Sequence, residues 1–143
     1  MLYLGFTGPR QIEIYQEEKI VRHLKKLNDE HAPAFAVTGA CKGVDACVAR
    51  WFAENTDVQN IIVVPAARRW VDDRLYALKR SVFLEMPPNP VTTNEAVLYR
   101  ERNEKLVELA DKLVAFRHHV RGGTQMTIDI ATKAKKLLEI VPI

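Results

Sequence analysis

Three glycine-bearing segments decide how this chain folds: Phe6-Thr7-Gly8-Pro9-Arg10, Thr38-Gly39-Ala40-Cys41-Lys42-Gly43-Val44-Asp45 and Arg121-Gly122-Gly123-Thr124. Each lies just past a short apolar run and is followed by a helical pattern. Loops that leave the carboxyl ends of parallel strands meet at one edge of a sheet, and ligands bind at that edge. The three segments therefore predict a pocket for a phosphate-bearing ligand there.

The apolar pattern around these segments alternates between strand and helix spacing. We expect strands over 2–6, 34–38, 60–64, 82–84, 112–116 and 139–141. We expect helices over 11–28, from 44 to about 55, briefly within 66–80, over 93–110, and along a last stripe of Met126, Ile130, Ala134 and Leu137. This alternation predicts a Rossmann-like three-layer α/β/α sandwich with a mainly parallel sheet. With 143 residues, one nucleotide-binding domain over 1–143 is the natural expectation.

Composition and charge exclude several classes of function. The chain is 48% hydrophobic and 27% charged, which is ordinary for a globular protein. A net charge of +3 suits an anionic ligand without requiring one, and it is weak support for nucleic-acid binding. Cys41 and Cys47 form neither a disulfide framework nor a zinc pattern, so we expect a reducing cytoplasm. We expect no signal peptide, no membrane segment, no metal and no resident cofactor.

The first segment offers Gly8, Pro9 and Arg10 as ligand contacts. Glycine allows a ligand to approach the backbone closely, and an arginine can donate two parallel hydrogen bonds to one phosphate. A tight turn with a solvated arginine explains the same residues equally well. The sequence alone does not separate these two interpretations.

The second segment is the stronger anion-binding candidate. The connection between a strand and a helix here contains the small residues Gly39, Ala40 and Gly43, and also Lys42. Free main-chain amides at the start of that helix are expected to face an anion. Asp45 lies in the first helical turn, where it either stabilises the helix end or bonds a ribose or an arginine across the pocket. The segment lacks both the full G-x-G-x-x-G spacing and the Walker lysine pattern, so the sequence supports neither a standard dinucleotide fold nor a P-loop kinase.

Two further clusters belong to the predicted site. Asn103 falls on the apolar stripe of the helix over 93–110, so it either bonds a neighbouring loop or reaches into the pocket. Arg102 is expected either at the pocket edge or in a surface ion pair with Glu95. Gly122, Gly123 and Thr124 stand at a helix N-terminus, which makes them a phosphate cradle, an N-cap, or both.

Other residues have open roles. Asp129 lies on the second turn of the last helix, near the loop or on the outer face, and His118 and His119 are expected as solvated loop residues. Cys41 has no evident His or Asp partner for nucleophilic chemistry. Trp70 either stacks on the base of a ligand or packs under a loop.

Taken together, these residues resemble the SLOG superfamily, which groups DNA-processing proteins of the Smf type (DprA) with the LOG phosphoribohydrolases. The segments around Phe6–Arg10 and Gly122–Thr124 resemble its first-strand loop and its terminal GGT. Thr38 to Ala46 resembles its GGARGVDxxA segment, and Arg102-Asn103 before Ala110–Phe116 resembles its RN…aDlvvaF segment. The match covers nearly the whole chain and suggests a small stand-alone member.

The resemblance implies a nucleotide or nucleotide-derived ligand at the carboxyl ends of the strands. LOG enzymes hydrolyse the N-glycosidic bond of nucleoside monophosphates with an arginine and the glutamate of a PGGxGTxxE motif. Counted from Gly122-Gly123, Asp129 replaces that glutamate, and its side chain is one methylene shorter. Because catalysis depends on positioning, this difference separates the chain from the enzymes it resembles.

Three hypotheses follow from the sequence. In the first, the chain is a nucleotide-binding or nucleotide-sensing module in which Arg10 and Arg102 neutralise phosphate and Asp45 or Asn103 orients the sugar. In the second, it is a phosphoribohydrolase in which Asp129 and Arg102 are catalytic. The third is single-stranded DNA binding, which predicts a steep salt dependence and ranks last on net charge. A homo-oligomer is compatible with all three.

Overall fold

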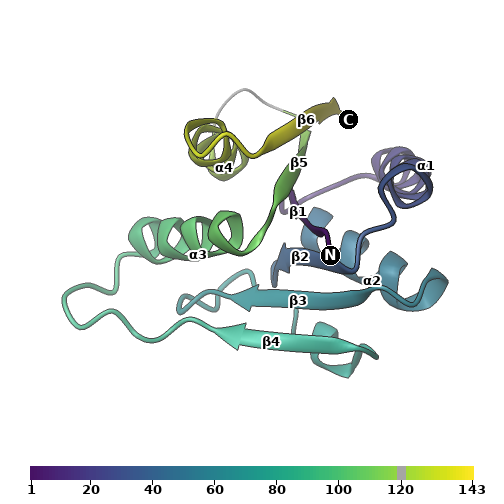
Figure 1. The fold of residues 1–143 in the computed structure, drawn as a ribbon. Helices are drawn as coiled ribbons and strands as arrows, with labels where there is room; N and C mark the ends of the chain where they lie inside the picture. Colours follow the sequence, from purple (N-terminus) through teal and green to yellow (C-terminus); the bar gives the residue numbers. More distant parts are fainter. Residues whose placement is uncertain (119–121) are drawn as a thin grey trace.

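Six parallel strands form one sheet in the order β4-β3-β2-β1-β5-β6 (Figure 1). The computed structural model describes residues 1–118 and 122–143. The strands are β1 (Tyr3–Thr7), β2 (Phe35–Gly39), β3 (Gln59–Val64), β4 (Ser81–Glu85), β5 (Lys112–Arg117) and β6 (Leu137–Pro142). All the pairings between these strands are parallel, as the alternation of strands and helices in the sequence predicts.

Helices cover both faces of this sheet. The helices are α1 (Ile14–His31), α2 (Val44–Asn55), the short 3-10 helix η1 (Asp73–Ala77), α3 (Glu95–Leu109) and α4 (Gly123–Lys133). Figure 1 shows α1 and α2 on one side of the sheet and α3 and α4 on the other. The expected Rossmann-like three-layer α/β fold is therefore confirmed.

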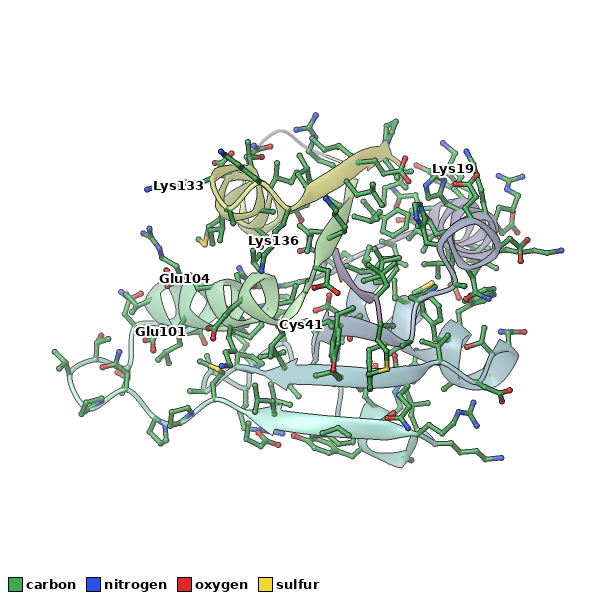
Figure 2. All side chains as sticks on the ribbon, in the orientation of Figure 1. Lys19, Cys41, Glu101, Glu104, Lys133 and Lys136 are labelled. Carbon is green, nitrogen blue, oxygen red and sulfur yellow. The ribbon has the colours of Figure 1, made fainter. Side chains whose placement is uncertain are left out.

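The core follows from the alternation of side chains along each buried strand. On β3, Ile62 packs against the residues of α2, whereas the next residue, Val63, packs against Leu106 and Val107 of α3. Because helices cover both faces, both sets of side chains are apolar, which is why the strands appear in the sequence as continuous apolar runs. Figure 2 shows Lys136 beside α3, where its Nζ donates to the main-chain oxygens of Val107 and Glu108.

The strand order places a switch point between β1 and β5. The chain moves outward from β1 to β4 and then crosses back, so that β5 lies beside β1. The loop after β1 leads to α1 on one face, and the loop after β5 leads to α4 on the other. Two neighbouring loops that diverge to opposite faces leave a crevice at the carboxyl edge.

One local expectation is wrong in detail. Leu137 belongs to β6 and not to the last helix, because α4 ends at Lys133 and Lys135 takes a left-handed conformation with φ of 59°. The cap of α3 is Asn94, whose side chain accepts the N–H of Val97. In the part of the chain that the structure describes, no helix is both long and apolar enough to cross a membrane.

Candidate functional site

A pocket of about 1220 Å³ occupies the crevice at the switch point. It is enclosed by the loop after β1, the start of α2, the face of α3 and the first turn of α4. The residues that the sequence predicted for the site and that line this pocket are Gly8, Pro9, Arg10, Asp45, Arg102, Asn103, Gly122, Gly123 and Thr124. The structure therefore brings together most of the predicted ligand-binding residues, from four separate elements.

A buried ion pair lies against the pocket. Arg102 Nη1 is 3.8 Å from Asp45 Oδ2, and the two side chains are each 8% exposed. This separation is too long for a hydrogen bond. The Asp45 carboxylate instead accepts the N–H of Cys41 at 3.2 Å. Arg102 thus lies at the pocket, as one of its two expected positions, but it is buried and forms no surface ion pair: α3 turns its buried face toward the sheet, and Arg102 lies on that face beside Asn103.

Burial controls the electrostatics of this ion pair. It raises the pKa of the Asp45 carboxyl above its ordinary value, while the Arg102 guanidinium opposes the rise. Burial also raises the pKa of the Cys41 thiol, and the Asp45 charge raises it further. Figure 2 places Cys41 among the side chains between the sheet and α3. A thiol whose pKa is raised is a poor nucleophile. Cys41 lines the pocket, and we assign it to the pocket wall and not to the chemistry.

The Arg102 guanidinium keeps unused donors. Its Nε donates to Asn103 Oδ1 at 2.8 Å, and its Nη1 lies 3.7 Å from the Cys41 sulfur. Among the described residues no acceptor binds Nη2, although Arg102 is only 7% exposed and lines the pocket. A buried guanidinium with a free N–H is suited to binding an anion.

Of the two positions that the sequence left open for Asn103, the structure shows the pocket, and its side-chain partners lie in helices and not in a neighbouring loop. Asn103 lines the pocket, and its amide Nδ2 lies 3.8 Å from the sulfur of Met126 in the first turn of α4. Its Oδ1 meanwhile holds Arg102. Asn103 therefore links the ion pair on α3 to the N-terminus of α4.

That N-terminus has no side-chain cap in the described chain. Gly122 is the N-cap residue with φ of 94°, and α4 begins at Gly123. Thr124 is consequently not the N-cap, but it lines the pocket together with both glycines. Within residues 1–118 and 122–143, the N–H groups of Gly123, Thr124 and Gln125 have no acceptor. Uncapped amides and the helix dipole favour an anion at this point.

The second cationic side chain of the pocket is Arg10. Its guanidinium carbon lies 4.3 Å from the centre of the Tyr99 ring and 5.3 Å from the centre of the Trp70 ring. The two aromatic residues are held together because the Tyr99 hydroxyl accepts the N–H of Trp70 at 3.4 Å. Trp70, which the sequence left unassigned, therefore lines the pocket.

The loop between β2 and α2 does not present its amides to the pocket. The N–H of Lys42 donates to Trp70 O, and the N–H of Val44 donates to Pro9 O, both at 3.0 Å. Gly39, Ala40, Lys42 and Gly43 do not line the pocket; Lys42 and Gly43 line a separate hollow of about 310 Å³. Their assignment as ligand contacts stays a prediction of the sequence.

Asp129 also lies away from the pocket. It is exposed on α4, and its Oδ1 accepts a hydrogen bond from Gln125 Nε2 at 2.9 Å. Gln125 in turn accepts one from Arg117. The catalytic role that the resemblance suggested for Asp129 therefore stays a prediction without support from this geometry.

Several residues of the site were missed by sequence reasoning. Tyr99 was not among the predicted site residues, although it lines the pocket. Gln16, which is 3% exposed, also lines it and lies 3.4 Å from His118 Nδ1. His119 and Arg121 lie outside the described residues. Within residues 1–118 and 122–143, no three His, Cys, Asp or Glu side chains gather as a metal site.

Comparison with known proteins gives the fold. No protein-family model matches the chain, and no curated protein matches it. Among solved structures, DNA processing protein A from Helicobacter pylori, described for its single-stranded DNA binding mode, aligns with a TM-score of 0.73 over 96% of this chain at 16% identity. The chain spans 64% of the length of that protein's chain.

Carriers of the molybdenum cofactor share the fold as well. The molybdenum cofactor binding protein from Rippkaea orientalis has a TM-score of 0.62 at 20% identity, over 96% of this chain and 76% of its own. The Moco carrier protein from Chlamydomonas reinhardtii has a TM-score of 0.61 at 19% identity, over 99% of this chain and 77% of its own. These likenesses are consistent with the superfamily that the sequence resembles, and at such identities they establish the architecture alone.

Proposed function

We propose that this chain binds a nucleotide or nucleotide-derived ligand in the carboxyl-edge pocket and acts as a binding or sensing module. The observation that carries the proposal is the buried Arg102 guanidinium, whose Nη2 has no acceptor among the described residues, together with the N-terminus of α4, which no described side chain caps. A phosphate bound there receives main-chain N–H groups and a charged guanidinium together.

The rest of the pocket suits the other parts of a nucleotide. Trp70 is half-buried on the pocket wall, where its indole can contact a base, and Asn103 provides an amide beside the proposed phosphate position. Neighbours with this fold are described as binding single-stranded DNA or the molybdenum cofactor, which supports a ligand-binding role in general.

Both cysteines are buried free thiols, which supports the reducing cytoplasm as the proposed compartment.

The test places a negative charge at the proposed phosphate position. Thr124→Asp puts a carboxylate in the first turn of α4, which favours the helix but repels a phosphate. Thr124→Asn is the matched control, because it has nearly the same shape without the charge. Nucleotides retained by the purified protein after ultrafiltration would be identified and quantified by mass spectrometry. We expect the wild type and Thr124→Asn to retain nucleotide, and Thr124→Asp to lose about tenfold or more in affinity.

The same experiment also tests the two alternatives. Release of free base and ribose 5-phosphate would establish a phosphoribohydrolase, and turnover that survives Asp129→Ala would remove Asp129 from the reaction. Retention of none of the mono-, di- or cyclic nucleotides would overturn the proposal. Single-stranded DNA binding would then be tested with an oligonucleotide titrated at several salt concentrations, because phosphate contacts give a steep salt dependence.

A further inference from the structure

Arg10 is a second anion-binding group, distinct from the one formed by Arg102 and α4. It is half-buried on the pocket wall, and its contacts within the described chain are the faces of Tyr99 and Trp70. No carboxylate or carbonyl among residues 1–118 and 122–143 accepts its N–H groups. A cation held by two aromatic rings is fixed in position while its hydrogen-bond donors remain available.

The acidic residues around the pocket do not neutralise Arg10. Glu95 lies 4.0 Å from Arg69, and the Glu13 side chain caps the first turn of α1. Asp45 is buried opposite Arg102. The Arg10 guanidinium therefore faces the pocket without a carboxylate of the described chain within ion-pair distance, although the buried Asp45 charge acts on it from farther away.

The guanidiniums of Arg10 and Arg102 both lie near the ring of Tyr99. Arg10 is 4.3 Å and Arg102 is 5.6 Å from the centre of the Tyr99 ring. One anionic group on a ligand can satisfy Arg102 and the α4 amides, but it leaves the donors of Arg10 unused. A second anionic group directly linked to the first would reach Arg10.

We propose that the ligand carries a diphosphate, as in a nucleoside diphosphate or a dinucleotide, and that Arg10 binds the phosphate that a nucleoside monophosphate lacks. This inference rests on the proposed function, since it assigns a second phosphate position within the same pocket. It also assigns separate roles to the two arginines: Arg102 and α4 bind one phosphate, and Arg10 selects for the other.

The test compares dissociation constants for adenosine and guanosine mono- and diphosphates, and for a dinucleotide joined through a diphosphate, by isothermal titration calorimetry. We expect the wild type to bind diphosphates about tenfold or more tightly than the monophosphates, which is the usual strength of a charge-assisted hydrogen bond. Arg10→Ala should remove this preference and leave monophosphate affinity within about twofold. Arg10→Lys should retain part of the preference for diphosphates, because lysine keeps the charge without the paired donors. Tight binding of the dinucleotide but not of the nucleoside diphosphates would assign the diphosphate to a dinucleotide.

Arg69→Ala is the matched control. The Arg69 guanidinium lies 5.7 Å from the same Trp70 ring, but Arg69 pairs with Glu95 and does not line the pocket. Its removal should leave diphosphate affinity unchanged. An equal loss in Arg69→Ala and Arg10→Ala would indicate general electrostatic attraction and overturn the inference.

The remaining outcomes separate this inference from the proposed function. Equal affinity of the wild type for mono- and diphosphates would overturn the diphosphate assignment and leave nucleotide binding intact. An equal loss of both ligands in Arg10→Ala would show that Arg10 does not select for the second phosphate. Binding of none of these nucleotides would overturn the proposed function itself.

Discussion

The loop between β2 and α2 and the start of α4 have similar sequences but different environments. Both contain two glycines near the start of a helix, and in both the N-cap residue is a glycine with positive φ, Gly43 in one and Gly122 in the other. In the first loop, the N–H groups of Cys41 and Lys42 and that of Val44, the first residue of α2, donate to acceptors within the protein, whereas those of Asp45 and Ala46 have none among the described residues. At α4, the first N–H groups have no acceptor among residues 1–118 and 122–143.

The difference teaches that a glycine-rich helix start binds an anion only if the fold leaves its amides free. The β2–α2 loop is enclosed by the loop after β1 and by the segment around Trp70, both of which supply carbonyl acceptors. The start of α4 lies beside the pocket, where no described neighbour competes for its donors. One loop therefore holds the site together, and the other is available to a ligand.

The largest expected effect comes from removing the carboxylate that organises the β2–α2 loop. Asp45→Ala leaves the Arg102 guanidinium buried without a counter-charge and the Cys41 N–H without an acceptor. We expect a loss of about 3–5 kcal/mol in the free energy of unfolding, measured by urea denaturation. A double variant, Asp45→Leu with Arg102→Met, should recover much of this loss because no charge remains unpaired. A loss in Asp45→Ala below about 1 kcal/mol would contradict the role given to the ion pair.

The two N-cap glycines provide a direct test of the comparison. A Cβ on Gly43 would lie 2.4 Å from the carbonyl oxygen of Pro9, whereas no atom of residues 1–118 or 122–143 lies within 4 Å of a Cβ on Gly122. Gly43→Ala should therefore cost about 3 kcal/mol through steric overlap added to backbone strain, and Gly122→Ala about 1 kcal/mol through strain alone. The urea unfolding curves of the two variants, recorded side by side, measure the difference. Equal losses would mean that backbone strain, and not enclosure, distinguishes the two loops.

Asp72, which contacts the β2–α2 loop, makes a contribution to the free energy of unfolding that depends on pH. Its N–H donates to Ala40 O, and hydrogen bonds from Arg74 and Arg50 lower the pKa of its buried carboxyl from 3.8 to about 2. A lowered pKa in the folded state stabilises the protein fully above about pH 4, and that stabilisation is lost as the pH falls through 2. Because both arginines are partly exposed, we expect a contribution of about 1–2 kcal/mol.

The measurement is the difference in unfolding free energy between the wild type and Asp72→Asn from pH 6 to pH 2. Other carboxyl groups titrate equally in both proteins and cancel in this difference. We expect the difference to shrink as the pH falls below 4. A difference that stays constant across this range would exclude the pKa shift.

The smallest expected effect on stability is that of Arg10→Ala. Its guanidinium contacts two aromatic faces and no acceptor in the described chain, so its loss should cost about 0.5–1 kcal/mol. Thermal unfolding of the ligand-free variant is the measurement. A loss above about 2 kcal/mol would show that Arg10 is a structural residue of the β1–α1 loop.

Much of the architecture could be predicted from local pattern. The parallel sheet and the helices follow from apolar runs and from spacing at Ile20, Leu24 and Leu27, and the three loops do lie at the carboxyl edge. Arg102 was placed at the pocket edge because helical periodicity does not reveal a buried partner such as Asp45, 57 positions away in the sequence. The stacking of Arg10 on Tyr99 and Trp70 was hidden for the same reason.

The sequence by itself determined the three-layer fold, the edge at which the site lies and nine of the residues that line it. These depend on side-chain periodicity and on the rule that parallel strands end at a common edge, and both are local properties. Only the tertiary structure decided which amides are free, which arginine is buried and which is available. Those outcomes depend on acceptors and aromatic rings supplied by distant segments, so they exist only once the chain has packed.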